Sequence, residues 1–338
     1  MKENTLTKNE RNNTISLLRM LATLFIIICH VFQYYNMEAA WWFNVGVQMF
    51  LCISGFLYGN KRITSSVDFV WSNIKKILIP YYCYLAVVIP VYYIFHRELL
   101  NRGIITSVLL TSGTIHGIEH LWFICYILLC YIMTPYLQAL ADKMKTLKWY
   151  AFLGAFLVLA VLEHYLFVYF NSYFAVTAIF CYLFGYFASV FMHNYKYSIV
   201  KGSMCLLALV TIAMNGVKIY NLYVSPVAFP GYDIIATYTH PFLGIALVLV
   251  PAITFKNLKR NRLLELSDKY SFYIYIVHQI YILGPFTLLT ATDSVPVNLG
   301  IVVVLILVSA VLLKFIADHI ARLCSRVAEL VKSRICSV

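Results

Sequence analysis

The chain has 338 residues, of which 62% are hydrophobic and only 12% are charged. A soluble protein of this length could not bury so much apolar surface, so the composition excludes an ordinary soluble enzyme and indicates an integral membrane protein. The net charge of +12 does not indicate a nucleic-acid partner, because no basic domain stands outside the apolar stretches.

Ten apolar stretches reach the length of about 20 residues that crosses a bilayer. In chain order they are 14–35, 42–60, 77–96, 120–140, 149–168, 171–191, 199–219, 232–254, 269–291 and 297–320. The first stretch is too long for a signal peptide, and further spans follow it. We therefore expect an all-α integral membrane protein with about ten transmembrane helices. It should form a single membrane domain over residues 1–338, with no appended extracytoplasmic domain.

The basic residues predict the orientation of these helices. With both termini cytoplasmic, only Arg97, Arg102 and Lys218 would be extracytoplasmic, and Lys314 would lie within the last helix. The other 22 of the 26 Lys and Arg residues would face the cytoplasm, as the positive-inside rule requires. The expected location is the plasma (inner) membrane, as a multi-pass protein in contact with its lipids.

Arg19 and His30 both lie in the first apolar stretch. Eleven helical steps return to within roughly 20° of the starting direction over a rise of about 16 Å. One strip of this helix therefore carries a cation near one membrane face and an imidazole more than halfway across. Ionisable groups at this depth usually face a protein interior or an aqueous cavity, although Arg19 could also extend to the membrane surface. A neutral imidazole at His30 would suit a general base acting on a hydroxyl.

Two further groups of residues are candidates for binding. Lys75 and Lys76 precede the third stretch, where cations either set topology and contact anionic lipids or hold a polyphosphate. His116, Glu119 and His120 fit the H-x-x-E-H pattern of a zinc peptidase class. Gly117 is unfavourable in a helix and no third ligand is evident, so we expect no metal site. We expect instead a polar outer rim that leads into Trp122.

Two later histidines lie inside apolar stretches. His240 is about a third of the way in from the outer side of the eighth, and His278 is near the middle of the ninth. Each is either a neutral residue that packs between helices or part of a polar interior. The span centres contain few acidic residues, which argues against a mechanism driven by carboxylates. The nine cysteines form no obvious pair on the outer side, so we expect no disulfide.

Several short motifs resemble those of the integral-membrane acyltransferase-3 family. Arg19 and His30 are similar to its basic-x10-histidine motif, and the segment 54–57 (Ser-Gly-Phe-Leu) to its second-span signature. Lys75 and Lys76 ahead of Pro80 resemble the basic–proline entry to its third span, with Lys where Arg is common. His120 with Trp122, and the segment from Ser271 to His278, are similar to its later signatures.

The resemblance implies transfer of an acyl group, most often acetyl, from a cytoplasmic coenzyme A thioester to a hydroxyl of an extracytoplasmic or lipid-linked surface glycan. His30 would be the catalytic histidine, and Arg19, Lys75 and Lys76 would bind the donor. His120, Trp122, His240, Ser271 and His278 are candidates for acceptor-side or supporting roles. No tightly bound cofactor is implied, because acyl-CoA is a substrate. The sequence leaves open the glycan, the acyl group, an acyl-histidine intermediate and the oligomeric state.

The alternative function is a transporter or flippase for a lipid-linked sugar or a small solute. Such proteins often contain inverted repeats with paired broken helices. The prolines in the two halves of this sequence do not form a matching pattern, which favours the acyltransferase.

Overall fold

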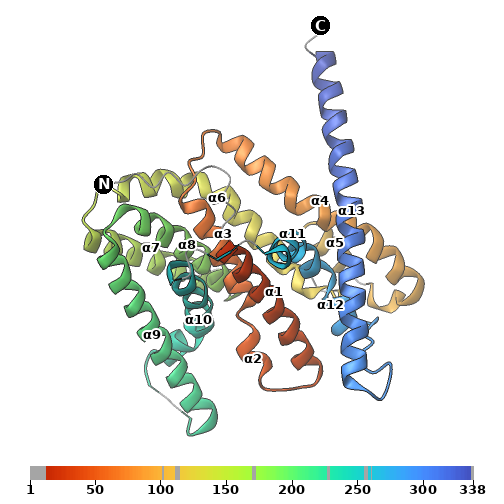
Figure 1. The fold of residues 1–338 in the computed structure, drawn as a ribbon, viewed down its shortest axis with the longest axis horizontal. Helices are drawn as coiled ribbons and strands as arrows, with labels where there is room; N and C mark the ends of the chain where they lie inside the picture. Colours follow the sequence, from red (N-terminus) through yellow and green to blue (C-terminus); the bar gives the residue numbers. More distant parts are fainter. Residues whose placement is uncertain are drawn as a thin grey trace.

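The computed structural model describes residues 13–100, 103–110, 115–169, 173–226, 229–254, 258–259 and 261–335. These residues form helices and no strand (Figure 1). The helices are α1 (Asn13–Tyr34), α2 (Ala40–Phe43), α3 (Gly46–Gly59), α4 (Ser66–Phe95), α5 (Gly103–Val108), α6 (Trp122–Met144), α7 (Trp149–Tyr169), α8 (Tyr173–Asn194), α9 (Tyr197–Tyr223), α10 (Tyr232–Thr254), α11 (Arg262–Val277), α12 (Gln279–Ile282) and α13 (Val295–Ile335). Single 3₁₀ turns occur at Arg97–Leu99 and Glu119–Leu121.

Eight candidate membrane spans are present in the described residues, by helix length and composition. They correspond to eight of the ten expected spans, so the all-helical membrane class is confirmed and the expected number is not. The stretch 171–191 forms the 22-residue helix α8, which is not among the eight. The stretch 269–291 is not a continuous helix, because α11 ends at Val277 and α12 covers only Gln279–Ile282.

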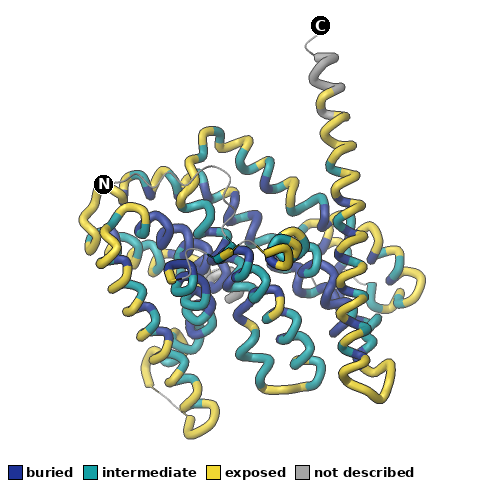
Figure 2. Tube along the Cα trace, in the orientation of Figure 1, coloured by how far each residue is buried: buried dark blue, intermediate teal, exposed yellow. Residues whose placement is uncertain are grey.

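Two other helices are longer than their apolar stretches. The side chain of Ser65 accepts a hydrogen bond from the backbone N–H of Asp68 (3.3 Å) and caps α4. The third span therefore begins at Ser66 instead of residue 77, and Lys75 and Lys76 lie inside the helix. Helix α13 runs to Ile335 and extends out of the bundle, and residues 322–327 of its projecting part are exposed (Figure 2).

The centre of the bundle is built on close contact between α3 and α8. A Cβ atom on Gly55 would lie 2.1 Å from the carbonyl oxygen of Tyr182, and one on Gly185 would lie 2.1 Å from that of Cys52. Such distances are impossible for a real Cβ atom, so glycine lets the two backbones touch. Small residues are used in this way where membrane helices pack tightly. Figure 2 shows buried residues concentrated in this central region.

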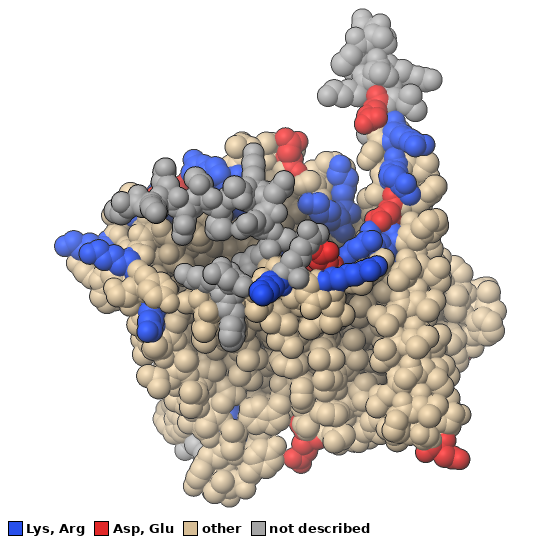
Figure 3. Space-filling model, viewed as in Figure 1, with Lys and Arg blue, Asp and Glu red and all other residues tan. Residues whose placement is uncertain are grey.

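Charge is distributed unevenly between the two ends of the bundle. Lys and Arg gather at the end from which α13 projects, with some Asp and Glu among them, whereas the charge visible at the opposite end is mainly acidic (Figure 3). The start of α1 and the end of α13 point toward the same, basic end (Figure 1). Some basic residues on which the expected orientation rests lie outside the described residues, namely Lys2, Lys8, Arg11, Arg102, Lys256 and Arg260.

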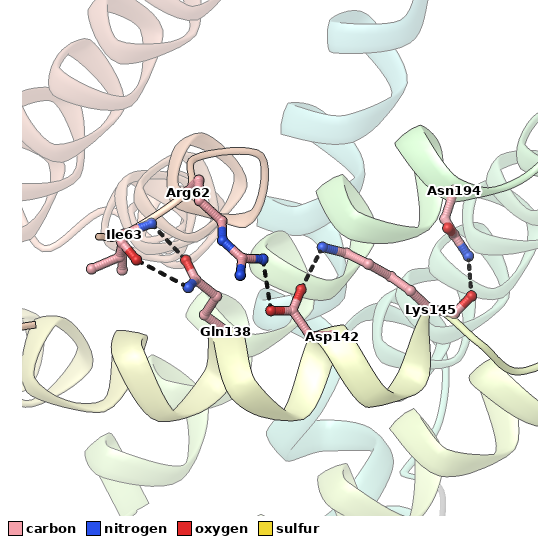
Figure 4. A network of polar contacts seen from close by, with 6 residues as sticks. All are labelled: Arg62, Ile63, Gln138, Asp142, Lys145 and Asn194. Carbon is pink, nitrogen blue, oxygen red and sulfur yellow. Dashed lines mark hydrogen bonds and ion pairs between the residues drawn. The ribbon is translucent and has the colours of Figure 1, made fainter. Parts of the chain in front are cut away.

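A polar network at the end of α6 ties this helix to the loop after α3 and to the end of α8 (Figure 4). Asp142 binds both Arg62 (2.9 Å) and Lys145 (3.0 Å). Gln138 accepts from the backbone N–H of Ile63 (2.7 Å) and donates to its carbonyl (3.2 Å). Asn194 donates to the carbonyl of Lys145 (2.9 Å). The Arg62 side chain is 73% exposed, so the contribution of its ion pair to stability is small.

Candidate active site

Helices α1 and α11 lie side by side, and polar contacts join them at two levels. At the first level Arg19 forms an ion pair with Asp268. At the second level the ring of His30 stacks on that of His278, with centroids 5.1 Å apart and planes at 28°. Both helices advance from the first contact to the second, so they run parallel. The strip of α1 predicted from sequence therefore faces α11 at its first level and the residue that follows α11 at its second.

Three histidines meet at the second level. His278 lies between His30 and His120, and its ring centroid is 4.7 Å from that of His120. It occupies the break between α11 and α12 and is completely buried. Its Nδ1 is 2.7 Å from the carbonyl oxygen of Tyr275 and donates to it, whereas its Nε2 has no partner among the described residues.

His120 lies in the segment before α6 and is held in place by residues of α11 and α12. Its backbone N–H donates to Oε1 of Gln279 (3.0 Å), and its Nε2 lies 2.9 Å from the carbonyl oxygen of Tyr275. The Tyr275 hydroxyl donates back to the carbonyl of His120. Gly117 lets this segment approach, because it has φ of 85° and a Cβ there would be 2.6 Å from Cα of Gly284. The match to H-x-x-E-H is thus a turn against the end of α12 and not a zinc helix.

A cavity of about 490 Å³ opens beside this cluster. Its polar lining combines His30 and Gln33 of α1 with Glu119 and Gln279, and Trp122 and Tyr126 supply aromatic walls. Nδ1 of His30 is 2.6 Å from Oε1 of Gln33. The carboxylate of Glu119 is close enough to act electrostatically on His30. The cavity therefore provides a potential base, a carboxylate, amides and aromatic surfaces, a combination suited to a polar acceptor.

A second polar region lies nearer the basic end. The pKa of Lys61 is lowered from its ordinary 10.5, first by burial and then by the positive charges of Lys76 and Arg19. Lys61 is therefore close enough to both Lys76 and Arg19 to be repelled by them. Lys61 also lies over the ring of Tyr58, 5.1 Å from its centroid. An anionic group bound between them would relieve this repulsion.

Other residues singled out from the sequence lie elsewhere. His240 packs on Trp41 (centroids 3.8 Å apart) and its Nε2 is 2.7 Å from the carbonyl oxygen of that residue, outside the cavity lining. Ser271 is buried on α11, and Lys75 is exposed over the ring of Trp71 (5.4 Å). Within the described ranges no group of three or more His, Cys, Asp or Glu residues is arranged to hold a metal ion.

Sequence reasoning missed several residues of this site. Asp268 and Gln279 are distant in sequence from the residues that they contact, and nothing in the chain signals those contacts. Tyr275 lies in the segment from Ser271 to His278 noted above, but its contact with His120 was not predicted. Glu119 entered the sequence analysis only as part of a metal motif, and the structure places it in the lining of the cavity. Gln33 could have been found, because a residue three positions after His30 shares its helix face.

Comparison with protein-family models matches residues 12–318 to the acyltransferase-3 model, described as an acyltransferase domain. No curated protein and no solved structure matches the chain. The match covers α1 to most of α13, and so includes the histidine cluster and the cations at the basic end. The chain therefore belongs to the acyltransferase-3 family of membrane acyltransferases.

Proposed function

We propose that this protein transfers an acyl group, most simply acetyl, from cytoplasmic acyl-CoA to a hydroxyl of an extracytoplasmic or lipid-linked glycan. His30 acts as the general base. The observation that carries the proposal is the place of His30 in a cavity with amide, carboxylate and aromatic lining. Aromatic and amide side chains suit the apolar faces and hydroxyl edges of a sugar.

In the proposed reaction Nε2 of His30 takes the proton from the acceptor hydroxyl as its oxygen attacks the thioester carbonyl. The tetrahedral intermediate collapses by breaking the C–S bond, and the proton on His30 passes to the departing sulfur. The negative charge of Glu119 stabilises the imidazolium that forms in between. The products are the acyl ester and coenzyme A.

The cations at the basic end bind the phosphates of the donor in this proposal. Arg19, Lys61 and Lys76 provide the positive charge, and the pantetheine arm extends from them along α1 toward His30. The helical rise from Arg19 to His30 is about 16 Å, a distance that an extended pantetheine arm can cover.

Substitution His30→Ala tests the proposal. We expect acyl transfer from labelled acetyl-CoA to membrane glycan to fall roughly 10²–10⁴-fold, with the protein accumulating normally in the membrane. His193→Ala is the matched control, because His193 does not line the cavity and bonds to the carbonyl of Ser189 on its own helix. Normal glycan acylation in the His30 variant would exclude His30 as the base.

A further inference from the structure

The hydrogen bond between His30 and Gln33 determines which ring nitrogen can act as the base. Nδ1 of His30 is 2.6 Å from the side-chain carbonyl oxygen of Gln33. A carbonyl oxygen only accepts hydrogen bonds, so Nδ1 must carry the proton. A neutral His30 then has its lone pair on Nε2, which forms no hydrogen bond with the described residues.

This arrangement opposes the intrinsic preference of a free neutral imidazole, which holds its proton on Nε2. The stacked ring of His278 contacts a face of His30 and not its edge, so it does not select between the tautomers. Glu119 bonds instead to Nδ1 of His116 (3.2 Å) and to the backbone N–H of Gly117 (2.8 Å). In the described structure the selection of the tautomer therefore falls to Gln33.

We propose that Gln33 is a positioning residue that holds His30 in the Nδ1–H tautomer and so presents the lone pair of Nε2 to the acceptor hydroxyl. This inference rests on the proposed function for its catalytic consequence, but the tautomer itself is a property of the resting protein. The role resembles that of the buried carboxylate in serine-protease triads, which orients an imidazole and fixes its tautomer. An uncharged amide performs it here, one helical turn from the base.

Two substitutions of Gln33 test whether its side-chain oxygen holds the tautomer of His30. Gln33→Met keeps the length of the side chain but removes the acceptor, so we expect kcat to fall about tenfold or more while KM for acetyl-CoA changes little. Gln33→Glu restores an acceptor and should preserve most of kcat. Its carboxylate would also stabilise the imidazolium, so the acid limb of the pH–rate profile should move to higher pH.

Other titratable groups near His30 could also contribute to the acid limb of the pH–rate profile. Those around His30 lie on four segments of the chain. They are Cys29 of α1, Glu119 and His120 before α6, Cys125 and Tyr126 of α6, Tyr275 of α11 and His278 at the α11–α12 break. All of them are unchanged in the Gln33 variants. A shift that appears with Gln33→Glu and not with Gln33→Met is therefore assigned to the new carboxylate.

Nitrogen-15 NMR of histidine-labelled protein in detergent tests the tautomer without any acyl transfer. The His30→Ala spectrum assigns the signals, and we expect wild-type His30 to be protonated at Nδ1 and Gln33→Met to shift it toward Nε2–H. An Nε2–H tautomer in the wild type, or wild-type kcat in Gln33→Met, would overturn the inference. If no variant and no wild-type sample transfers acetyl, the proposed function fails while the NMR result still decides the tautomer.

Discussion

At the level of single residues, Arg19 has two possible roles that differ in their partners. It pairs with Asp268, whose side chain is only 10% exposed, and its charge also reaches Lys61 among the cations of the basic end. The first contact holds α1 against α11, whereas the second would attract the phosphates of the proposed donor. The two roles predict different effects on KM for acyl-CoA when Arg19 or Asp268 is replaced.

We predict that Arg19→Ala raises KM for acyl-CoA more than it lowers kcat or raises KM for the acceptor. The reason is that Arg19 lies at the basic end, about 16 Å of helix away from His30. Initial rates in membrane vesicles with labelled donor measure the effect. Asp268→Asn is the control, because it removes the same ion pair but leaves the cation. If both substitutions had equal effects on donor KM, Arg19 would serve only the contact between helices.

A pH dependence is expected from Lys61. The pKa of its ammonium group lies below the ordinary 10.5 because burial and the charges of Lys76 and Arg19 disfavour the protonated form. In the proposed donor site, Lys61 is charged below that pKa and would attract the donor phosphates, and this attraction would be lost as the pH rises through the pKa. We predict that KM for acyl-CoA begins to rise at a lower pH than an ordinary lysine would cause.

The substitution Lys61→Arg tests this explanation, because a guanidinium stays protonated at the alkaline pH values at which Lys61 loses its proton. The variant should keep a low KM for acyl-CoA where the wild type loses affinity. Parallel alkaline profiles for the two proteins would show that Lys61 does not contact the donor.

At the level of the helices, the contact between α3 and α8 is the part of the fold most sensitive to added volume. We predict that Gly185→Ala lowers the stability of the bundle by about 1–3 kcal/mol or more, since its Cβ would meet the backbone of Cys52. Thermal unfolding in detergent should register this as a lower midpoint and a lower yield of folded protein.

A glycine with free space around it provides the comparison. A Cβ on Gly216 of α9 would meet no atom within 4 Å, and alanine is favoured over glycine in a helix by up to about 1 kcal/mol. Gly216→Ala should therefore unfold at the same temperature or higher. A similar loss of stability in both variants would contradict the close approach of α3 and α8.

The sequence predicts helices better than it predicts which helices meet. Apolar runs gave most spans, and the periodicity of a helix placed Arg19 and His30 on one strip of α1. The break at His278 was missed, because the segment around it is apolar apart from His278 and Gln279 and contains no Gly or Pro until Gly284 and Pro285. The partners on α11 were also missed, because a single sequence does not encode the pairing of segments some 250 positions apart.

For the whole molecule, the uneven distribution of charge leads to a prediction about sidedness. Basic side chains gather at one end of the bundle (Figure 3), and among the cations there are Arg19, Lys61 and Lys76. The positive-inside rule assigns such an end to the cytoplasm. His30 lies farther along α1, at the cavity. A donor that enters from the basic end would therefore present its thioester deep in the membrane, close to the other side.

We predict that acyl-CoA is consumed only from the cytoplasmic face and that the acylated hydroxyl appears on the outer side. Sealed vesicles of known orientation provide the measurement: inside-out vesicles should use added acyl-CoA, and right-side-out vesicles should not. Detergent permeabilisation of the right-side-out vesicles is the control, since it should restore consumption. Equal use from both sides would contradict the assigned entry of the donor, and use from the right-side-out face alone would reverse the orientation. If the basic end served only to set topology, neither preparation would consume acyl-CoA, even after permeabilisation.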